Sequence, residues 1–168
     1  MHNLVSSPIG FIHLLSALVA IVLGTMVMTM RKGTRTHRRL GYSYVIAMLI
    51  LNITALMIYR LFGRFGPFHV ASVLSLLTLL MGIIPALIRK PKNTWLWYHM
   101  AGMYYSTIGL YSAFVSEVAV RIPGAPFFAV VTISTVVIFI IAVWWFQRQS
   151  KKWYLSIYLD PAPEKQKK

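Results

Sequence analysis

Five long apolar segments alternate with short polar connectors along the chain. A helix that crosses a hydrocarbon core of about 30 Å needs about 20 apolar residues, because each residue adds about 1.5 Å. Backbone groups in lipid must be paired within their own segment, so each of the five predicts a membrane-spanning helix and the fold is expected to be all-α. The approximate limits of the segments are residues 9–30, 40–61, 67–88, 94–120 and 126–146.

The basic residues gather in alternate connectors. Of the 17 Lys and Arg residues, all but Arg60, Arg64 and Arg121 lie in the first connector, the third connector or the C-terminal tail. Basic loops stay in the cytoplasm, so this pattern predicts an outer N-terminus and a cytoplasmic C-terminus. Five crossings, an odd number, likewise place the two termini on opposite sides of the membrane.

The chain divides into two parts on this interpretation. Residues 1–147 form one transmembrane bundle, and residues 148–168 form a basic cytoplasmic tail. The tail ends in prolines and lysines from Asp160 onward, a composition typical of disorder.

Composition excludes several protein classes. Hydrophobic residues make up 58% and charged residues 12% of the chain, against about 45–50% and about 25% in soluble domains. This excludes a disordered chain, a fibrous chain and most soluble enzymes. The net charge of +14 is explained by topology and by anionic lipid headgroups on the cytoplasmic side, and no nucleic-acid partner is expected. The chain has no cysteine, which excludes disulfides and thiolate zinc sites.

A weak internal repeat pairs four histidines. The first and third helices open with Phe-Ile-His13 and Phe-His69, and the second and fourth open near His37 and His99, each followed by Gly and Tyr. The pattern predicts two hairpins related by an axis along the membrane normal, with the fifth helix appended. His13 would then lie opposite His69 near the outer surface, and His37 opposite His99 near the cytoplasmic surface.

Glu117 is the only carboxylate in the membrane region, since Asp160 and Glu164 lie in the tail. Its structural interpretation is an ion pair with Arg121, one helical turn later. Its functional interpretation is a transition-metal site, most simply zinc, formed by His13, His69 and Glu117. Such a site leaves a coordination position open for water, so metal-assisted hydrolysis is one outcome.

Two alternatives stay open beside the metal site. Facing histidines suit two b-type haems that carry electrons across the bilayer, one held by His37 and His99 and the other by His13 and His69. The shallow positions of His37 and His69 count against this. The other alternative is a structural or accessory subunit whose histidines are only hydrogen-bonded, and which packs against a membrane protein partner or a second copy of itself. Known catalytic motifs are missing, so the sequence does not decide whether the protein is an enzyme.

The helical part resembles a bacterial family of predicted membrane proteins of unknown function. The resemblance covers roughly residues 9–125, and its most specific element is His37-Arg38-x-x-Gly41. The other residues that carry it are His13, Gly24, Gly33, His99, Met103 and Arg121. It implies a multi-pass bundle and supplies no activity. Taken together with the apolar segments and the charge pattern, we expect a multi-pass protein of the bacterial cytoplasmic membrane.

Overall fold

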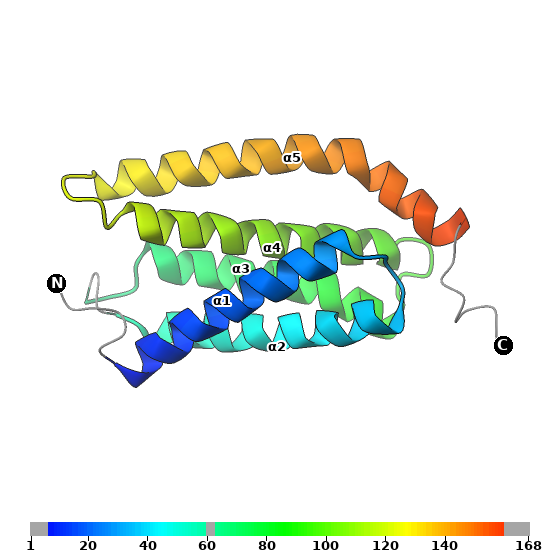
Figure 1. Cartoon of the computed structure of the whole chain (residues 1–168), viewed down its shortest axis with the longest axis horizontal. Coiled ribbons are helices and arrows are strands. Elements are labelled where there is room, and N and C mark those ends of the chain that lie inside the picture. Colours follow the sequence, from blue (N-terminus) through cyan, green and yellow to red (C-terminus); the bar gives the residue numbers. More distant parts are fainter. Residues whose placement is uncertain (1–6, 60–62, 160–168) are drawn as a thin grey trace.

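Five α-helices form the part of the chain that the computed structural model describes, residues 7–59 and 63–159. They are α1 (Pro8–Thr29), α2 (Arg35–Met57), α3 (Pro67–Ile88), α4 (Trp95–Ala119) and α5 (Phe127–Leu159), and they run side by side as an elongated bundle (Figure 1). The all-helical prediction is confirmed. The expected disorder of the tail from Asp160 falls on residues outside those described.

Capping residues decide where the helices begin. Ser7 accepts a hydrogen bond from the backbone N–H of Gly10 (3.1 Å), and Pro8 occupies the first turn of α1. Thr34 accepts from the N–H of His37 (3.0 Å), so α2 begins at Arg35. Hydrophobicity alone predicted a start near residue 40, because the first turn of α2 is polar. The cap brings His37 into the helix.

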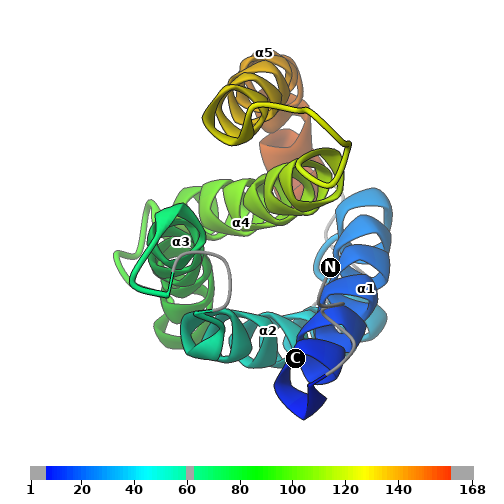
Figure 2. The same ribbon diagram turned by 90° about the vertical axis from the view of Figure 1, so that its left-hand side faces the viewer.

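Helices α1 to α4 form a closed ring in chain order, and α5 lies outside it against α4 (Figure 2). Helices α1 and α2, and likewise α3 and α4, are the two most extensively packed pairs, so the two predicted hairpins are present. In the described part of the chain, the backbone of α1 does not approach that of α3 or α5, and the backbone of α2 does not approach that of α4, although the Tyr44 and Ser106 side chains meet between α2 and α4. Helices α1 and α3 are therefore diagonal partners in the ring, as are α2 and α4.

Two glycines let α3 and α4 cross at backbone contact. A Cβ atom on Gly102 would lie 2.5 Å from the Cα atom of Gly82, and a Cβ on Gly82 would lie 2.7 Å from the backbone nitrogen of Met103. Any larger residue would push the helices apart, because small residues at a helix interface allow this close approach. The crossing fixes the position of the Gly82 carbonyl group.

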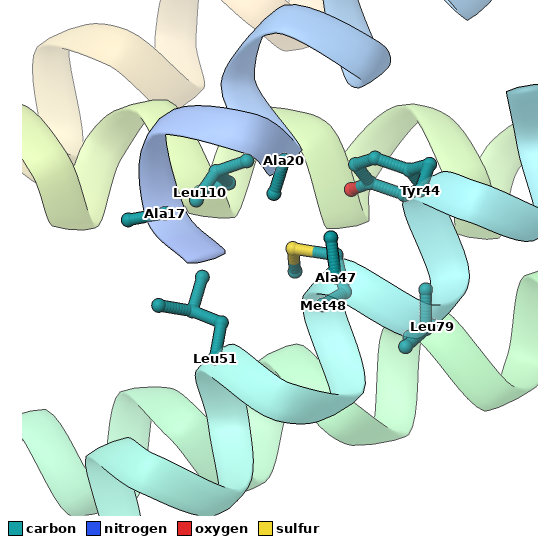
Figure 3. Packing of buried hydrophobic residues seen from close by; sticks show 8 residues of the cluster. All are labelled: Ala17, Ala20, Tyr44, Ala47, Met48, Leu51, Leu79 and Leu110. Atoms are coloured by element: carbon teal, nitrogen blue, oxygen red, sulfur yellow. The ribbon is translucent and has the colours of Figure 1, made fainter. Parts of the chain in front are cut away.

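An apolar layer fills the middle of the ring. Its side chains come from all four helices (Figure 3), and Met48 and Leu79 are fully buried in it. Polar pairs flank the layer. Tyr44 Oη lies 3.0 Å from Ser106 Oγ on one side, and Ser72 Oγ donates to Asn52 Oδ1 (3.1 Å) on the other.

The outer surface of the bundle is apolar, with many exposed Leu, Ile, Val and Phe side chains. In the described residues, α1, α2, α3 and α5 are long and apolar enough to cross a membrane. Helix α4 is about 37 Å long at 25 residues and lies between α3 and α5. Its lower hydropathy reflects its Ser, Tyr and His residues. The chain is a multi-pass membrane protein.

Helix α5 is longer than the apolar pattern predicted. The apolar segment stops near residue 146, but the helix continues through Leu159 (Figure 1). The extension carries Arg148, Lys151 and Lys152 together with Trp153. Because most of these residues are polar, the hydrophobic pattern does not predict that the helix continues through them. We call the end of the bundle that holds this extension and the α1–α2 and α3–α4 connectors the basic end, and the other the opposite end.

Candidate functional site

At the opposite end, α1 places His13 between α2 and α4. The side chain of His13 is 15% exposed. Its Nδ1 atom lies 3.2 Å from Thr54 Oγ1, and its Nε2 atom lies 4.0 Å from Glu117 Oε2. Arg121 Nη2 donates to the other carboxylate oxygen, Oε1, at 2.9 Å. The ion pair predicted between Glu117 and Arg121 is confirmed.

His69 is turned towards the start of its own helix. Its Nδ1 atom accepts a hydrogen bond from the backbone N–H of Gly66 (3.1 Å), and its ring packs against Tyr59 and Phe65. The residue is 4% exposed, and its Nε2 atom has no hydrogen-bond partner in the described residues. In a neutral imidazole that accepts at Nδ1, Nε2 carries the proton. His69 in this state has no free lone pair for a metal.

The predicted metal site of His13, His69 and Glu117 does not assemble. Within residues 7–59 and 63–159, no three His, Asp or Glu side chains lie close enough to hold one metal ion. The helices of His13 and His69 are diagonal partners whose backbones do not approach each other, and the Gly66 N–H takes the Nδ1 lone pair of His69. The same two facts remove the support for a second haem between His13 and His69.

At the basic end, the structure brings His37 and His99 together across the other diagonal. Their ring centroids are 6.4 Å apart, and the ring planes are nearly perpendicular, at 89°. His99 Nδ1 lies 2.9 Å from the carbonyl oxygen of Gly82, so Nδ1 donates and Nε2 keeps its lone pair. His37 Nδ1 is buried and has no hydrogen-bond partner among the described residues.

The two histidines line a cavity of about 260 Å³. This volume lies just below the range of about 300–1,000 Å³ that is typical of small-molecule pockets. The walls are mainly aliphatic and aromatic, and three cationic residues, Lys32, Arg38 and Arg89, also line the cavity. The aromatic lining residues are Tyr42, Tyr44, Trp95, Tyr104 and Trp153.

Two lining residues were missed in the sequence. Lys32 Nζ donates to the carbonyl groups of Val27 and Met28 at the end of α1, and burial lowers the pKa of Lys32 to about 8. A lysine two residues beyond the end of an apolar segment is a signal for this type of helix cap. Trp153 contacts Tyr104 with ring centroids 5.9 Å apart. It covers the cavity because α5 continues past its apolar segment.

Comparison with known proteins gives one family. A family model described as predicted membrane protein (DUF2306) matches residues 10–148 of the chain. No curated protein and no solved structure matches the chain.

Proposed function

Because the chain belongs to this DUF2306 family of predicted membrane proteins, and its helices enclose a histidine-lined cavity, we propose that it is a membrane haem protein. His37 and His99 would hold one b-type haem at the basic end, and the cavity of about 260 Å³ would widen to admit the porphyrin. The close approach of these two rings, with centroids 6.4 Å apart, carries the proposal.

The ring separation would allow both imidazoles to bind one iron atom. A bond between a metal and an imidazole nitrogen is about 2 Å long, and the ring centre lies about 1 Å beyond that nitrogen, so two such rings have centres about 6 Å apart. A bare zinc ion needs three or four protein ligands. The described residues offer only two here, and two suffice for haem because the porphyrin supplies the remaining four nitrogens.

Hydrogen bonding prepares His99 as a ligand. Metal-ligating histidines usually donate their other ring N–H to a carbonyl or carboxylate group, which fixes the tautomer and ring orientation. The Gly82 carbonyl accepts that bond from His99 Nδ1. The close crossing of α3 and α4 at Gly82 and Gly102 holds this carbonyl in place.

The chemistry of the cavity walls suits an amphipathic planar anion. Aromatic and aliphatic side chains would contact the apolar faces of such a molecule, and the guanidinium group of Arg89, which also lines the cavity, would suit a carboxylate at its edge. Bound haem would supply one-electron redox chemistry. Because the histidine pair of the described residues lies at the basic end, we propose electron exchange with a partner at the membrane surface on that side, the cytoplasmic side by the positive-inside rule.

The test is an absorbance spectrum of the full-length protein, purified in detergent from haem-supplemented cells, with iron measured on the same sample. We expect a Soret band and about one haem per chain by stoichiometry, as one ligand pair requires. His37→Ala and His99→Ala should each lose the low-spin spectrum, and added imidazole should restore it.

His69→Ala is the matched control, since His69 is buried at the opposite end, and it should keep the full spectrum. Absence of haem in the purified protein, together with failure to bind added haemin, would overturn the proposal. A spectrum that survives both His37→Ala and His99→Ala would overturn the ligand assignment.

A further inference from the structure

We propose that His13 and Glu117 form a proton-binding site at the opposite end of the bundle, which takes up one proton from the adjacent aqueous side and ties α1 to α4. This site is separate from the cavity and does not depend on haem. Its geometry comes from three helices, with His13 on α1, Thr54 on α2 and Glu117 on α4.

The hydrogen bonds of Thr54 fix the tautomer of His13. The Thr54 hydroxyl oxygen lies within hydrogen-bond distance of the backbone carbonyl oxygens of Ile50 (2.8 Å) and Leu51 (2.9 Å). A hydroxyl group has one hydrogen, and when that hydrogen is donated to either carbonyl, Thr54 Oγ1 accepts from His13 Nδ1. Neutral His13 therefore carries its proton on Nδ1 and presents the Nε2 lone pair to Glu117.

Two acceptors then face each other without a hydrogen between them. His13 Nε2 and Glu117 Oε2 are 4.0 Å apart, beyond the range of about 2.7–3.2 Å for a hydrogen bond. Arg121 Nη2 donates to Oε1 and leaves Oε2 as the carboxylate oxygen that faces His13. A proton on Nε2 would turn this gap into a charge-assisted hydrogen bond, which is stronger than a neutral one.

The surrounding charges favour a proton over a metal ion. From α4, Glu117 faces His13, and Arg121 stands behind the carboxylate; from α2 comes the neutral hydroxyl group of Thr54. Helix α1 itself has no Lys, Arg, Asp or Glu between Pro8 and Thr29. A divalent ion would find two ligands and a guanidinium group, whereas a proton needs one lone pair and one nearby carboxylate.

The site bridges the least extensive contact in the helix ring, the one between α1 and α4. Protonated His13 adds an ionic link across this contact, close to the ends of both helices. Uptake of the proton should therefore draw the outer turns of α1 and α4 together.

The direct test is ¹⁵N NMR of histidine-labelled full-length protein in detergent, titrated from pH 8 to pH 5. The resonance that His13→Gln removes should show Nδ1 as N–H at pH 8, and Nε2 should change from a lone-pair to an N–H shift as the pH falls. Glu117→Gln should abolish this change within the range, and His69→Gln should leave it intact. A His13 signal that carries its proton on Nε2 at pH 8, or that does not titrate, refutes the site.

A distance measurement tests the link between helices. The chain has no cysteine, so spin labels at Phe11→Cys on α1 and Val118→Cys on α4, both exposed positions, give a clean pair. We expect a shorter and narrower distance distribution at pH 5 than at pH 8, which is lost in Glu117→Gln. The pair Leu74→Cys and Val118→Cys, across α3 and α4, is the control and should not change. Equal distributions at both pH values would contradict the ionic link.

Discussion

Lys32 brings an ammonium group into the wall of the cavity. Its Nζ atom donates to the carbonyl groups of Val27 and Met28, the last acceptors of α1. Cations stabilise helix C-termini by binding these free carbonyls. Burial works in the opposite direction, because it penalises the charged form and lowers the pKa of Lys32 to about 8. Lys32 therefore changes charge close to physiological pH.

This pKa predicts that stability increases with pH. Between about pH 8 and the ordinary lysine value of 10.5, the unfolded state binds more protons than the folded state, so the free energy of unfolding rises as the pH rises. Thermal unfolding followed by tryptophan fluorescence should give a higher Tm at pH 9.5 than at pH 7.5. Lys32→Met should show a smaller increase, and an equal increase in both proteins would exclude Lys32 as its source.

Hydrogen-bond partners distinguish histidines that look alike in the sequence. His13, His69 and His99 all lie in the first turns of apolar helices. The Gly82 carbonyl and the Thr54 hydroxyl group make Nδ1 a donor in His99 and His13, whereas the Gly66 N–H makes Nδ1 an acceptor in His69. These partners come from other helices or from a connector. The repeat therefore predicted that His37 and His99 meet, but not that His69 would be unable to act as a ligand.

The crossing of α3 and α4 links helix packing to the proposed ligand. Gly82 and Gly102 touch there, and the Gly82 carbonyl orients His99. Packing at this point thus determines both the stability of the hairpin and the direction of the imidazole.

Gly102→Ala should destabilise the protein, because its Cβ atom would lie 2.5 Å from Gly82 Cα. We expect a loss of about 1–3 kcal/mol, the usual cost of overpacking, measured as a lower Tm. Displacement of Gly82 should also weaken haem retention.

Gly109→Ala is the matched control on the same helix. A Cβ atom there would meet nothing within 4 Å, and replacing glycine by alanine inside a helix stabilises it by about 0.5–1 kcal/mol. If Gly102→Ala and Gly109→Ala changed Tm in the same direction by the same amount, the close crossing of α3 and α4 would not explain the effect of Gly102→Ala.

The positions of the helix ends show which of them the hydrophobic pattern and the capping residues can predict from the sequence. The third apolar segment, residues 67–88, matches α3 because Pro67 marks its start and the charged pair Arg89-Lys90 follows its end. The start of α2 and the end of α5 were misplaced because both are polar turns. Pro, Ser and Thr caps are readable in the sequence, whereas the extension of α5 to Trp153 is held by contacts with α4.

The distribution of charge predicts how the bundle sits in the membrane. The basic end carries most of the Lys and Arg residues, so it should face the cytoplasm. Single cysteines at Ile122 and Asn93, exposed positions in connectors at the two ends, test this in intact cells. A membrane-impermeant maleimide should label Ile122→Cys directly, and Asn93→Cys only after permeabilisation. The reverse pattern would show the opposite orientation.

The apolar layer around Met48 and Leu79 (Figure 3) also separates the polar groups at the two ends of the bundle. Polar groups at the two ends of a bundle could conduct ions if water connected them through the middle. Close-packed apolar side chains exclude such a water file, because a buried water needs two to four polar partners. The bundle can therefore hold ionisable groups near both membrane surfaces and still insulate one compartment from the other.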